Sequence, residues 1–359
     1  MPLINRCGGG GGTPQLCGQV ENFKVLPGTT ALTAALSWTA PSPDEDNSFV
    51  GARIVRKTGS APTGINDGTV VYEGTALTYT DTGLTAGTTY YYRAFAYNAK
   101  KRYQTSKRTV SLVATTLTMG ASLNDSTWAQ ISAVSAAGYA PLYWSIGDTK
   151  SITLTGAASD TAIWQSTTLD VFIIGFNHNA SVEGSNRTHF HIGKQNGKQI
   201  GLYRGTYLPG YSTALILNDV LEKLPTDLKD VLKSVTKYET ASSSTVSSKS
   251  VSITNLGVIE VFGTAPEQTV TLLTGKQEQY EYYAAGNSAQ HFLNDNLTWN
   301  FNTQEYYTVG YVRLRDILFS TMSGFSNQYY DIGLDGRRRN TDIKESSASG
   351  YIQAPIFFV

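Results

Sequence analysis

The chain has 359 residues, with 28 basic and 28 acidic side chains and a formal net charge of zero. A nucleic-acid-binding protein would carry a surplus of Lys and Arg to neutralise phosphates, so this balance argues against DNA or RNA as a partner. Two cysteines exclude a disulfide framework. No run of residues approaches the ~20 apolar residues of a membrane-spanning helix, so membrane insertion is not expected.

The composition favours strands and turns over helices. Tyr occurs 22 times and Gly 34 times, while charged residues make up only 16% of the chain. Aromatic and β-branched residues suit a pleated, half-buried surface, and Gly, Ser and Asn suit turns. We therefore expect a mainly β protein of two or three domains.

Residues 1–19 are predicted to form a Gly-rich anchoring arm. Five consecutive glycines, residues 8–12, carry a high ordering cost and bury nothing. Leu3 and Ile4 are the part of this arm most able to dock on a partner. Cys7 and Cys17 are read as unpaired thiols, with a local disulfide or an intersubunit contact as the alternative. No apolar core of signal-peptide length precedes the glycines, so no ordinary secretion signal is expected.

Residues 20–117 contain strand-like runs at regular spacing, with turn residues between them. The candidate strands are 35–38, 51–56, 69–72, 84–97 and 112–117. In the fourth run, Tyr90, Tyr92, Ala94 and Ala96 share one face, because side chains alternate along a strand. This pattern predicts a β-sandwich.

Two features give this region a resemblance to a known family. Trp38 lies on an early strand, and Leu84, Gly87 and Tyr90 form a Leu-x-x-Gly-x-x-Tyr sequence at the start of a late strand. The pair resembles fibronectin type III domains. The resemblance implies that Trp38 lies in the core and that the Tyr90 hydroxyl ties its strand to the preceding loop. It also implies a binding or spacer module, not a catalytic one.

The region 121–359 mixes helical and strand patterns, so we expect an α+β domain. Asp125 or Ser126 can cap a helix over 128–137, in which Trp128, Ile131 and Val134 have helical spacing. The further predicted elements are strands at 151–154, 170–176, 188–193 and 258–262, helices at 215–221, 224–238 and 276–283, and a Ser/Thr-rich surface loop at 240–250. Residues 309–359 alternate strands with Gly, Asn and Asp turns.

Several phrases of this second region have a resemblance of their own. They are WAQI (128–131), YWSIGDTK (143–150), IIGFNHN (173–179), LPTDL (224–228), EVFG (260–263), YYAAGN (282–287) and APIFFV (354–359). Together they resemble an uncharacterised domain of tail and appendage proteins from phages and prophages of gut Firmicutes. The closing pattern is also similar to C-type-lectin-like folds, which present a sequence-tolerant loop surface on a fixed sheet.

The histidines offer one candidate metal site. His189 and His191 are two residues apart on a predicted strand, so their side chains point to one face, and His178 is near in sequence. Together they could form a three-histidine metal site. The alternative is a set of surface or half-buried polar side chains on an alternating strand, with no metal.

A second candidate site is a recognition surface within residues 324–350. Its predicted binding residues are Asn327, Tyr329, Tyr330, Arg337, Arg338, Arg339 and Asn340. Tyr, Asn and Arg combine rigid aromatic area with adaptable hydrogen bonds, as in antibody paratopes. The alternative is an ordinary polar hairpin with a solvated basic run.

The sequence contains no catalytic motif that fixes a reaction. No nucleophile elbow, phosphate loop or dinucleotide fingerprint is present, so we expect neither an enzyme nor a cofactor. A pair of carboxylates meeting in space could still hydrolyse a cell-surface polysaccharide.

These observations lead to one functional hypothesis with two alternatives. The resemblance implies a phage virion protein, assembled in the bacterial cytoplasm and attached through its arm to other virion proteins. As a homo-oligomer it would bind a host-surface glycan or protein, for example as a tail fibre, with avidity from repeated weak sites. The alternatives are a structural decoration protein of head, collar or baseplate, and a polysaccharide hydrolase.

Overall fold

The computed structural model describes the chain in two compact units, Met1–Thr118 and Met119–Val359. The described residues are 17–41, 49–104, 109–155, 167–195, 197–201, 203–205, 220–242, 245–264, 271–289, 292–293, 311–318, 328–332, 338–342, 351–353 and 355–359. Antiparallel sheets dominate both units, which confirms the predicted mainly β class.

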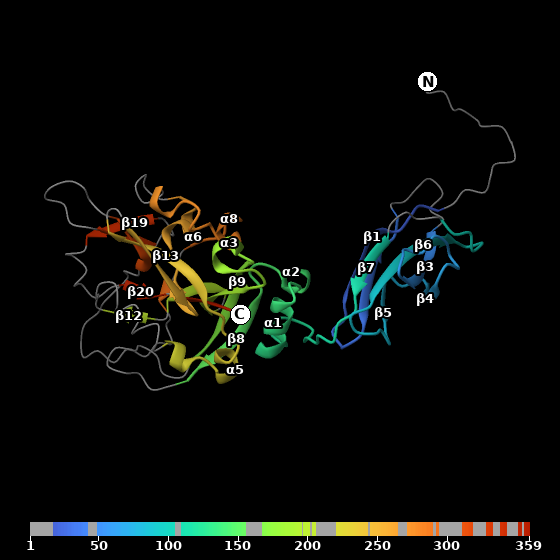
Figure 1. The fold of residues 1–359 in the computed structure, drawn as a ribbon, viewed down its shortest axis with the longest axis horizontal. Helices are drawn as coiled ribbons and strands as arrows, with labels where there is room; N and C mark the ends of the chain where they lie inside the picture. Colours follow the sequence, from blue (N-terminus) through green and yellow to red (C-terminus); the bar gives the residue numbers. More distant parts are fainter. Residues whose placement is uncertain are drawn as a thin grey trace, which may run out of the picture. The chain divides into compact units, whose positions relative to one another are not determined.

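The first unit is a β-sandwich of two antiparallel sheets (Figure 1). One sheet has the order β1 (Glu21–Pro27), β2 (Ala34–Thr39), β5 (Thr78–Asp81). The other has the order β4 (Thr69–Gly74), β3 (Phe49–Thr58), β6 (Thr89–Asn98), β7 (Thr109–Val113). This division into a three-stranded and a four-stranded antiparallel sheet is fibronectin type III-like.

Alternating burial builds the core between these sheets. Along β2 every second side chain is buried, ending at Trp38, whose ring packs near those of Phe23 and Tyr72. The Tyr90 hydroxyl accepts a hydrogen bond from the Thr85 backbone N–H at 3.1 Å, which ties β6 to the preceding loop. Gly87 allows that loop to turn, because its φ of +74° is strained for any residue with a side chain.

Cys17 is buried in the same core cluster. The first described residue of the chain therefore belongs to the sandwich and not to an arm, which corrects its predicted environment. Burial of this small, weakly polar side chain is ordinary for a cysteine. Cys7, Leu3 and Ile4 lie outside the described residues.

The second unit is built around a sheet whose strand order differs from the order of the strands in the chain. The last strand of the chain is an interior strand of this sheet. Along one path the order is β8 (Thr149–Leu154), β9 (Thr167–Phe176), β10 (Thr188–Gln195), β21 (Pro355–Phe358), β15 (Ile253–Asn255). Strand β10 also pairs with β11 (Lys198–Gly201), which continues to β16 (Phe292–Leu293). The apolar runs of β9 and β21 are buried on both faces, as interior strands require.

Two further sheets complete the second unit. One has the order β12 (Tyr203–Gly205), β20 (Tyr351–Gln353), β17 (Tyr311–Leu318), β18 (Gln328–Ile332), β19 (Arg338–Asp342). The other is a hairpin of β13 (Val235–Ser242) and β14 (Thr245–Val251). Short helices connect the strands: α2 (Ala140–Tyr143), α3 (Ala180–Glu183), α5 (Thr226–Lys229), α6 (Val258–Phe262) and α8 (Glu281–Ala284).

Helix α1 (Trp128–Ala136) confirms the predicted helix, but its cap is Thr127 and not Asp125 or Ser126. The Thr127 hydroxyl accepts the Gln130 N–H at 3.2 Å, and the Gln130 side chain accepts the Thr127 N–H at 2.9 Å. This reciprocal pair satisfies two backbone donors at the helix start. Trp128, on the buried face, meets Phe190 and Phe357 edge-on and so joins the helix to the central sheet.

Several predicted elements after residue 220 are wrong. The helix expected over 224–238 is only the four-residue α5, and the chain then enters β13. The loop expected at 240–250 is largely β14, and the two strands pair antiparallel along their length. Pairing satisfies every second backbone group of both strands, which outweighs the helical spacing of Leu228, Val231 and Val235.

Two more elements differ in type or length. The strand expected at 258–262 is helix α6, which begins at Gly257 with the Glu260 carboxylate accepting the Gly257 N–H at 2.7 Å. The helix expected at 276–283 is reduced to α8. The strands expected at 151–154, 170–176 and 188–193 are present as β8, β9 and β10. Among the described residues, none of the helices has the length and apolar character needed to cross a membrane.

Candidate functional site

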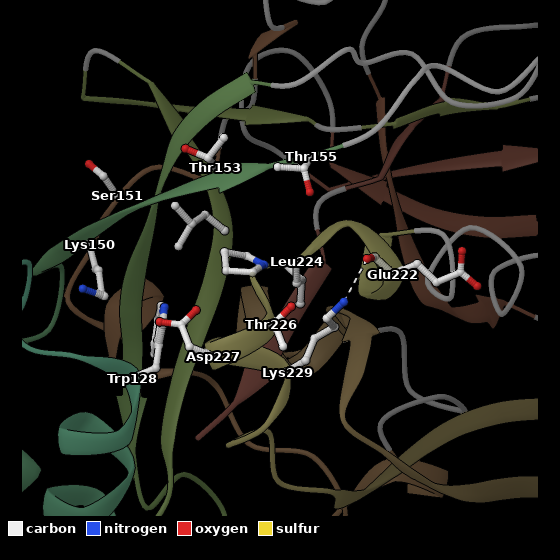
Figure 2. Close-up of a pocket in the computed structure, with 12 residues that line it drawn as sticks. Trp128, Lys150, Ser151, Thr153, Thr155, Glu222, Leu224, Thr226, Asp227 and Lys229 are labelled. Carbon is white, nitrogen blue, oxygen red and sulfur yellow. Dashed lines mark hydrogen bonds between the residues drawn. The ribbon is translucent and has the colours of Figure 1, made fainter.

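An open cleft of about 540 Å³ lies beside the outer edge of β8 in the second unit (Figure 2). Its lining residues are Trp128, Lys150, Ser151, Ile152, Thr153, Thr155, Glu222, Leu224, Pro225, Thr226, Asp227 and Lys229. Trp128, Ile152 and Leu224 are buried, whereas the hydroxyl-bearing residues of β8 are exposed. The cleft therefore combines an apolar base with polar walls.

The edge of β8 contributes backbone groups to this cleft. The Ser151 N–H donates to Asn124 Oδ1 at 2.9 Å, and the Thr155 N–H donates to the Lys223 carbonyl at 3.2 Å. Both bonds point away from β9. Because peptide groups of alternate residues point to the same side of a strand, the N–H and C=O of Thr153 face that side too. Within the described residues, β8 pairs only with β9.

The charged groups of the cleft belong to two walls. Lys150 Nζ donates to the carbonyls of Asn124 (2.9 Å) and Ser126 (2.7 Å), and burial lowers the pKa of this lysine. Lys229 Nζ donates to the Glu222 carbonyl at 3.1 Å, as Figure 2 shows. The exposed carboxylates of Glu222 and Asp227 lie on that same wall. Such a set of donors and acceptors suits a neutral, hydroxyl-rich ligand.

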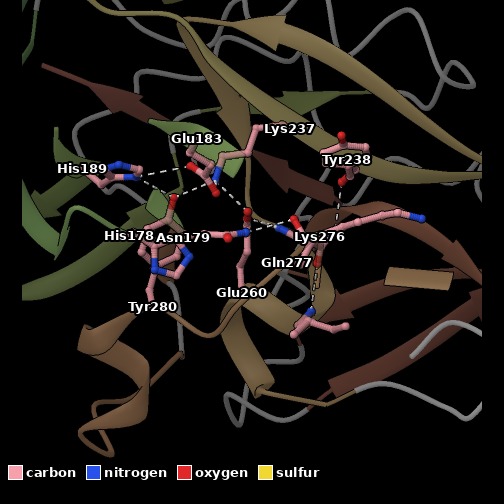
Figure 3. Close-up of polar contacts among 12 residues, drawn as sticks. His178, Asn179, Glu183, His189, Lys237, Tyr238, Glu260, Lys276, Gln277 and Tyr280 are labelled. Carbon is pink, nitrogen blue, oxygen red and sulfur yellow. Dashed lines mark hydrogen bonds and ion pairs between the residues drawn. The ribbon is translucent and has the colours of Figure 1, made fainter. Parts of the chain in front are cut away.

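A second polar assembly is buried in the second unit (Figure 3). Lys237 Nζ lies 2.7 Å from Glu183 Oε1, 2.7 Å from Glu260 Oε1 and 2.9 Å from the Tyr280 hydroxyl. These contacts use all three ammonium donors and join β13 to α3, α6 and the start of α8. Burial raises the pKa of Glu183, although the neighbouring Lys237 opposes that shift.

Two of the three histidines in the described part of the chain join this assembly. His189 Nδ1 lies 3.0 Å from the Tyr280 hydroxyl and 3.7 Å from Glu183 Oε2. The His178 ring stacks on the Tyr280 ring at 3.7 Å, and its Nδ1 lies 3.5 Å from Glu281 Oε2. Burial lowers the pKa of His189 well below its ordinary value, which favours the neutral imidazole.

The three histidines proposed as metal ligands are divided between two environments. The rings of His178 and His189 lie 5.7 Å apart, beside Tyr280. His191 Nδ1 instead shares a hydrogen bond of 3.0 Å with the Tyr283 hydroxyl, and its ring lies against Phe172. The grouping that has ligand atoms within 4.8 Å of one another is His178, Glu183 and Glu260.

The predicted recognition surface falls only partly on described residues. Tyr329 and Tyr330 lie on β18, and Arg338, Arg339 and Asn340 lie on β19, with Tyr330 opposite Asn340. Asn327 and Arg337 lie outside the described residues. The recognition role of this hairpin stays a prediction.

Sequence reasoning missed the residues that form the buried assembly. Lys237 was placed in a helix, and Glu183 and Glu260 belonged to no candidate site. One usable signal was present: Lys237 alternates with buried Val235 on a strand, so a charged side chain had to point inward. A charged side chain that is fully buried is almost always paired, and a carboxylate is the usual partner of a lysine.

Comparison with known proteins finds no protein family and no curated protein that matches the chain. Among solved structures, a fibronectin type III domain from the human KIAA0970 protein is 18% identical and covers 30% of this chain and 85% of that one, with a TM-score of 0.23. The structure described as "Myokine structure" is 16% identical (28% and 98% covered, TM-score 0.21). The twitchin kinase region of C. elegans is 19% identical (27% and 17% covered, TM-score 0.22).

These likenesses are too low to carry a functional argument. The fibronectin type III-like description of the first unit stands on its own strand order, its buried Trp38 and the hydrogen bond of Tyr90.

Proposed function

We propose that this protein is a structural component of a phage particle whose second unit binds a glycan on the host surface. The phrases of residues 121–359 that resemble phage tail and appendage proteins support the setting. The sandwich acts as a spacer, and the segment that precedes Cys17 attaches the protein to other virion proteins. Repeated copies on one particle multiply weak binding through effective concentration.

The observation that carries the binding role is the cleft beside β8. Sugar hydroxyls lose hydrogen bonds to water on binding, so a site must return them with donors and acceptors fixed in place. The cleft supplies the hydroxyls of Ser151 and Thr155, the carboxylates of Glu222 and Asp227, and the backbone groups of Thr153 on the side of β8 that no other described strand pairs with. Ser151 and Thr153 stand on β8 and Asp227 stands on α5, and such elements hold side chains more precisely than a loop does.

The test uses the purified full-length protein on a glycan array and on intact gut Firmicutes cells. Thr226 is exposed and lines the cleft, so Thr226→Arg should fill it without disturbing the core. We expect the variant to weaken glycan binding by roughly tenfold or more, a loss of about 1.4 kcal/mol. Ala285→Arg is the matched control, because Ala285 is exposed in the same unit and does not line the cleft.

Three outcomes would count against this proposal. If Thr226→Arg binds glycan as tightly as the wild-type protein, the cleft is not the binding site. Absence of binding to any glycan or cell, with the protein labelled at an internal ring of the particle, would favour a structural decoration protein. Release of free sugar from the array would identify a hydrolase.

A further inference from the structure

We propose that His178, Glu183 and Glu260 form a binding site for a divalent transition-metal ion of the zinc class, separate from the cleft beside β8. Each residue offers one ligand atom, and these atoms lie within 4.8 Å of one another. All three side chains are buried. They come from the segment after β9, from α3 and from α6, so one ion would join three elements.

Two buried side-chain atoms that lack a hydrogen-bond partner among the described residues point to a ligand. His178 Nε2 and Glu183 Oε2 are buried and have no hydrogen-bond partner within the part of the chain that the structure describes. Buried polar atoms are nearly always paired, and exceptions mark a missing water, an ion or a functional role. An imidazole nitrogen and a carboxylate oxygen are both ordinary zinc ligands.

The surroundings of the candidate ligands orient them. His178 Nδ1 faces the Glu281 carboxylate at 3.5 Å, an arrangement that leaves the lone pair on Nε2. Metal-bound histidines usually have such a carboxylate on the other ring nitrogen. Glu260 Oε2 is held by the Gly257 N–H at 2.7 Å, which leaves Oε1 to turn toward a cation.

Lys237 occupies the cation position in the described state. Its ammonium contacts Oε1 of both glutamates, as Figure 3 shows. Two carboxylates and one ammonium leave one negative charge uncompensated in a dry interior, where unpaired charge is costly. A divalent ion that displaces the ammonium from Glu260 would balance both carboxylates, while Lys237 keeps the Tyr280 hydroxyl as a partner. The metal and the ammonium therefore compete for Glu260.

The experiment titrates metal-free, full-length protein with Co²⁺ and Zn²⁺, following the visible absorption of cobalt and the thermal unfolding of the second unit. We expect one equivalent to bind, with a cobalt spectrum of nitrogen and oxygen ligation, and Zn²⁺ to raise the unfolding temperature. His178→Gln and Glu183→Gln should each weaken binding by roughly tenfold or more. Lys237→Met should strengthen it, because the competing ammonium is gone. Asp230→Asn is the control, since Asp230 is exposed and outside the cluster.

The wild-type spectrum alone can overturn the proposal. A thiolate-to-cobalt charge-transfer band would assign the ion to Cys7 or Cys17 instead. Failure of the folded wild-type protein to bind one equivalent would also refute the site, as would binding that persists unchanged in His178→Gln. Circular dichroism of each variant identifies those that fold, and the wild-type result decides the question if none does.

Discussion

The two units of this protein bury charge in different ways. In the sandwich, Arg56 Nη1 pairs with the Asp81 carboxylate at 2.8 Å, and the Tyr92 hydroxyl donates to the same carboxylate at 2.9 Å. The Arg56 side chain remains 20% exposed. In the second unit, Lys237 is 3% exposed and its partners Glu183 and Glu260 are 1% and 0% exposed.

This difference predicts which unit is more sensitive to the loss of one charged side chain. The Arg56–Asp81 pair is partly solvated on its arginine side only, because the Asp81 side chain is 6% exposed, so breaking it should cost less than breaking a pair that is buried on both sides. A fully buried pair contributes little in net terms, but removing one partner leaves an uncompensated charge in a dry interior. The sandwich should therefore tolerate changes at its charges, whereas the second unit should not.

The largest effect is expected from removing Lys237. Lys237→Ala leaves two buried carboxylates without their cation and should destabilise the second unit by about 3–5 kcal/mol. Arg56→Ala in the sandwich should cost about 1–2 kcal/mol, because the Tyr92 hydroxyl still donates to Asp81. Urea unfolding of metal-free protein, with the two units followed separately, measures both values. Equal losses would erase the contrast between the units.

A matched pair of tyrosines sharpens the same comparison. Tyr280→Phe removes a hydroxyl that bonds both Lys237 and His189, and we expect a loss of about 2–3 kcal/mol. Tyr92→Phe removes one bond to Asp81, which keeps Arg56, and should cost about 1–1.5 kcal/mol. Chemical denaturation of the two variants compares them directly. A larger loss of unfolding free energy in Tyr92→Phe than in Tyr280→Phe would contradict the expectation that the second unit depends more strongly on its buried polar network.

A smaller effect is expected at the start of α1. Thr127→Ala removes the hydroxyl that accepts the Gln130 N–H and should cost the second unit about 1 kcal/mol. Thr127→Ser keeps the hydroxyl and serves as the control. The midpoint of thermal unfolding reports the difference, and equal midpoints for the two variants would show that the cap adds nothing.

The smallest expected effect is the loss of stability of the sandwich at acidic pH, through Glu73 at its surface. A hydrogen bond from Lys101, with others from Arg53 and Tyr103, lowers the pKa of Glu73 from its ordinary value of 4.5 to about 2. Because the folded pKa is the lower one, the stabilisation is complete above about pH 4.5 and is lost as the pH falls toward 2. These groups are partly exposed, so the contribution is under about 1 kcal/mol.

Comparing wild type with Glu73→Gln between pH 7 and pH 2.5 isolates this contribution. The stability difference between the two proteins should shrink as the pH falls. If the stability difference stays constant over that range, Glu73 does not contribute to the loss of stability of the sandwich in acid.

The first unit was largely predictable from sequence because its local and tertiary preferences agree. Alternation along residues 34–39 and 89–98 gives the strands, and Trp38 with the Leu84–Gly87–Tyr90 spacing gives their arrangement. Each of these stretches is at most ten residues long. Strands of this kind need no distant partner to be recognised.

The second unit was less predictable because distant residues decide its structure. Residues 224–238 have helical spacing, yet pairing with β14 makes most of their second half a strand. The buried assembly joins Glu183, Lys237 and Glu260, which no local pattern connects. The cleft beside β8 likewise needs a strand and a segment about 70 residues later in the chain to meet, which no local window reveals.

The position of β21 has a consequence for how the protein is made. This strand lies between β10 and β15, and the backbone of Val359 exchanges two hydrogen bonds with Thr188. The pairing of β10 with β21 can therefore form only after residues 355–359 have been synthesised, while the sandwich has all of its described strands by residue 113. During that interval the apolar faces of β9 and β10 lack a central partner. The second unit is thus the part of the nascent chain whose central sheet forms last.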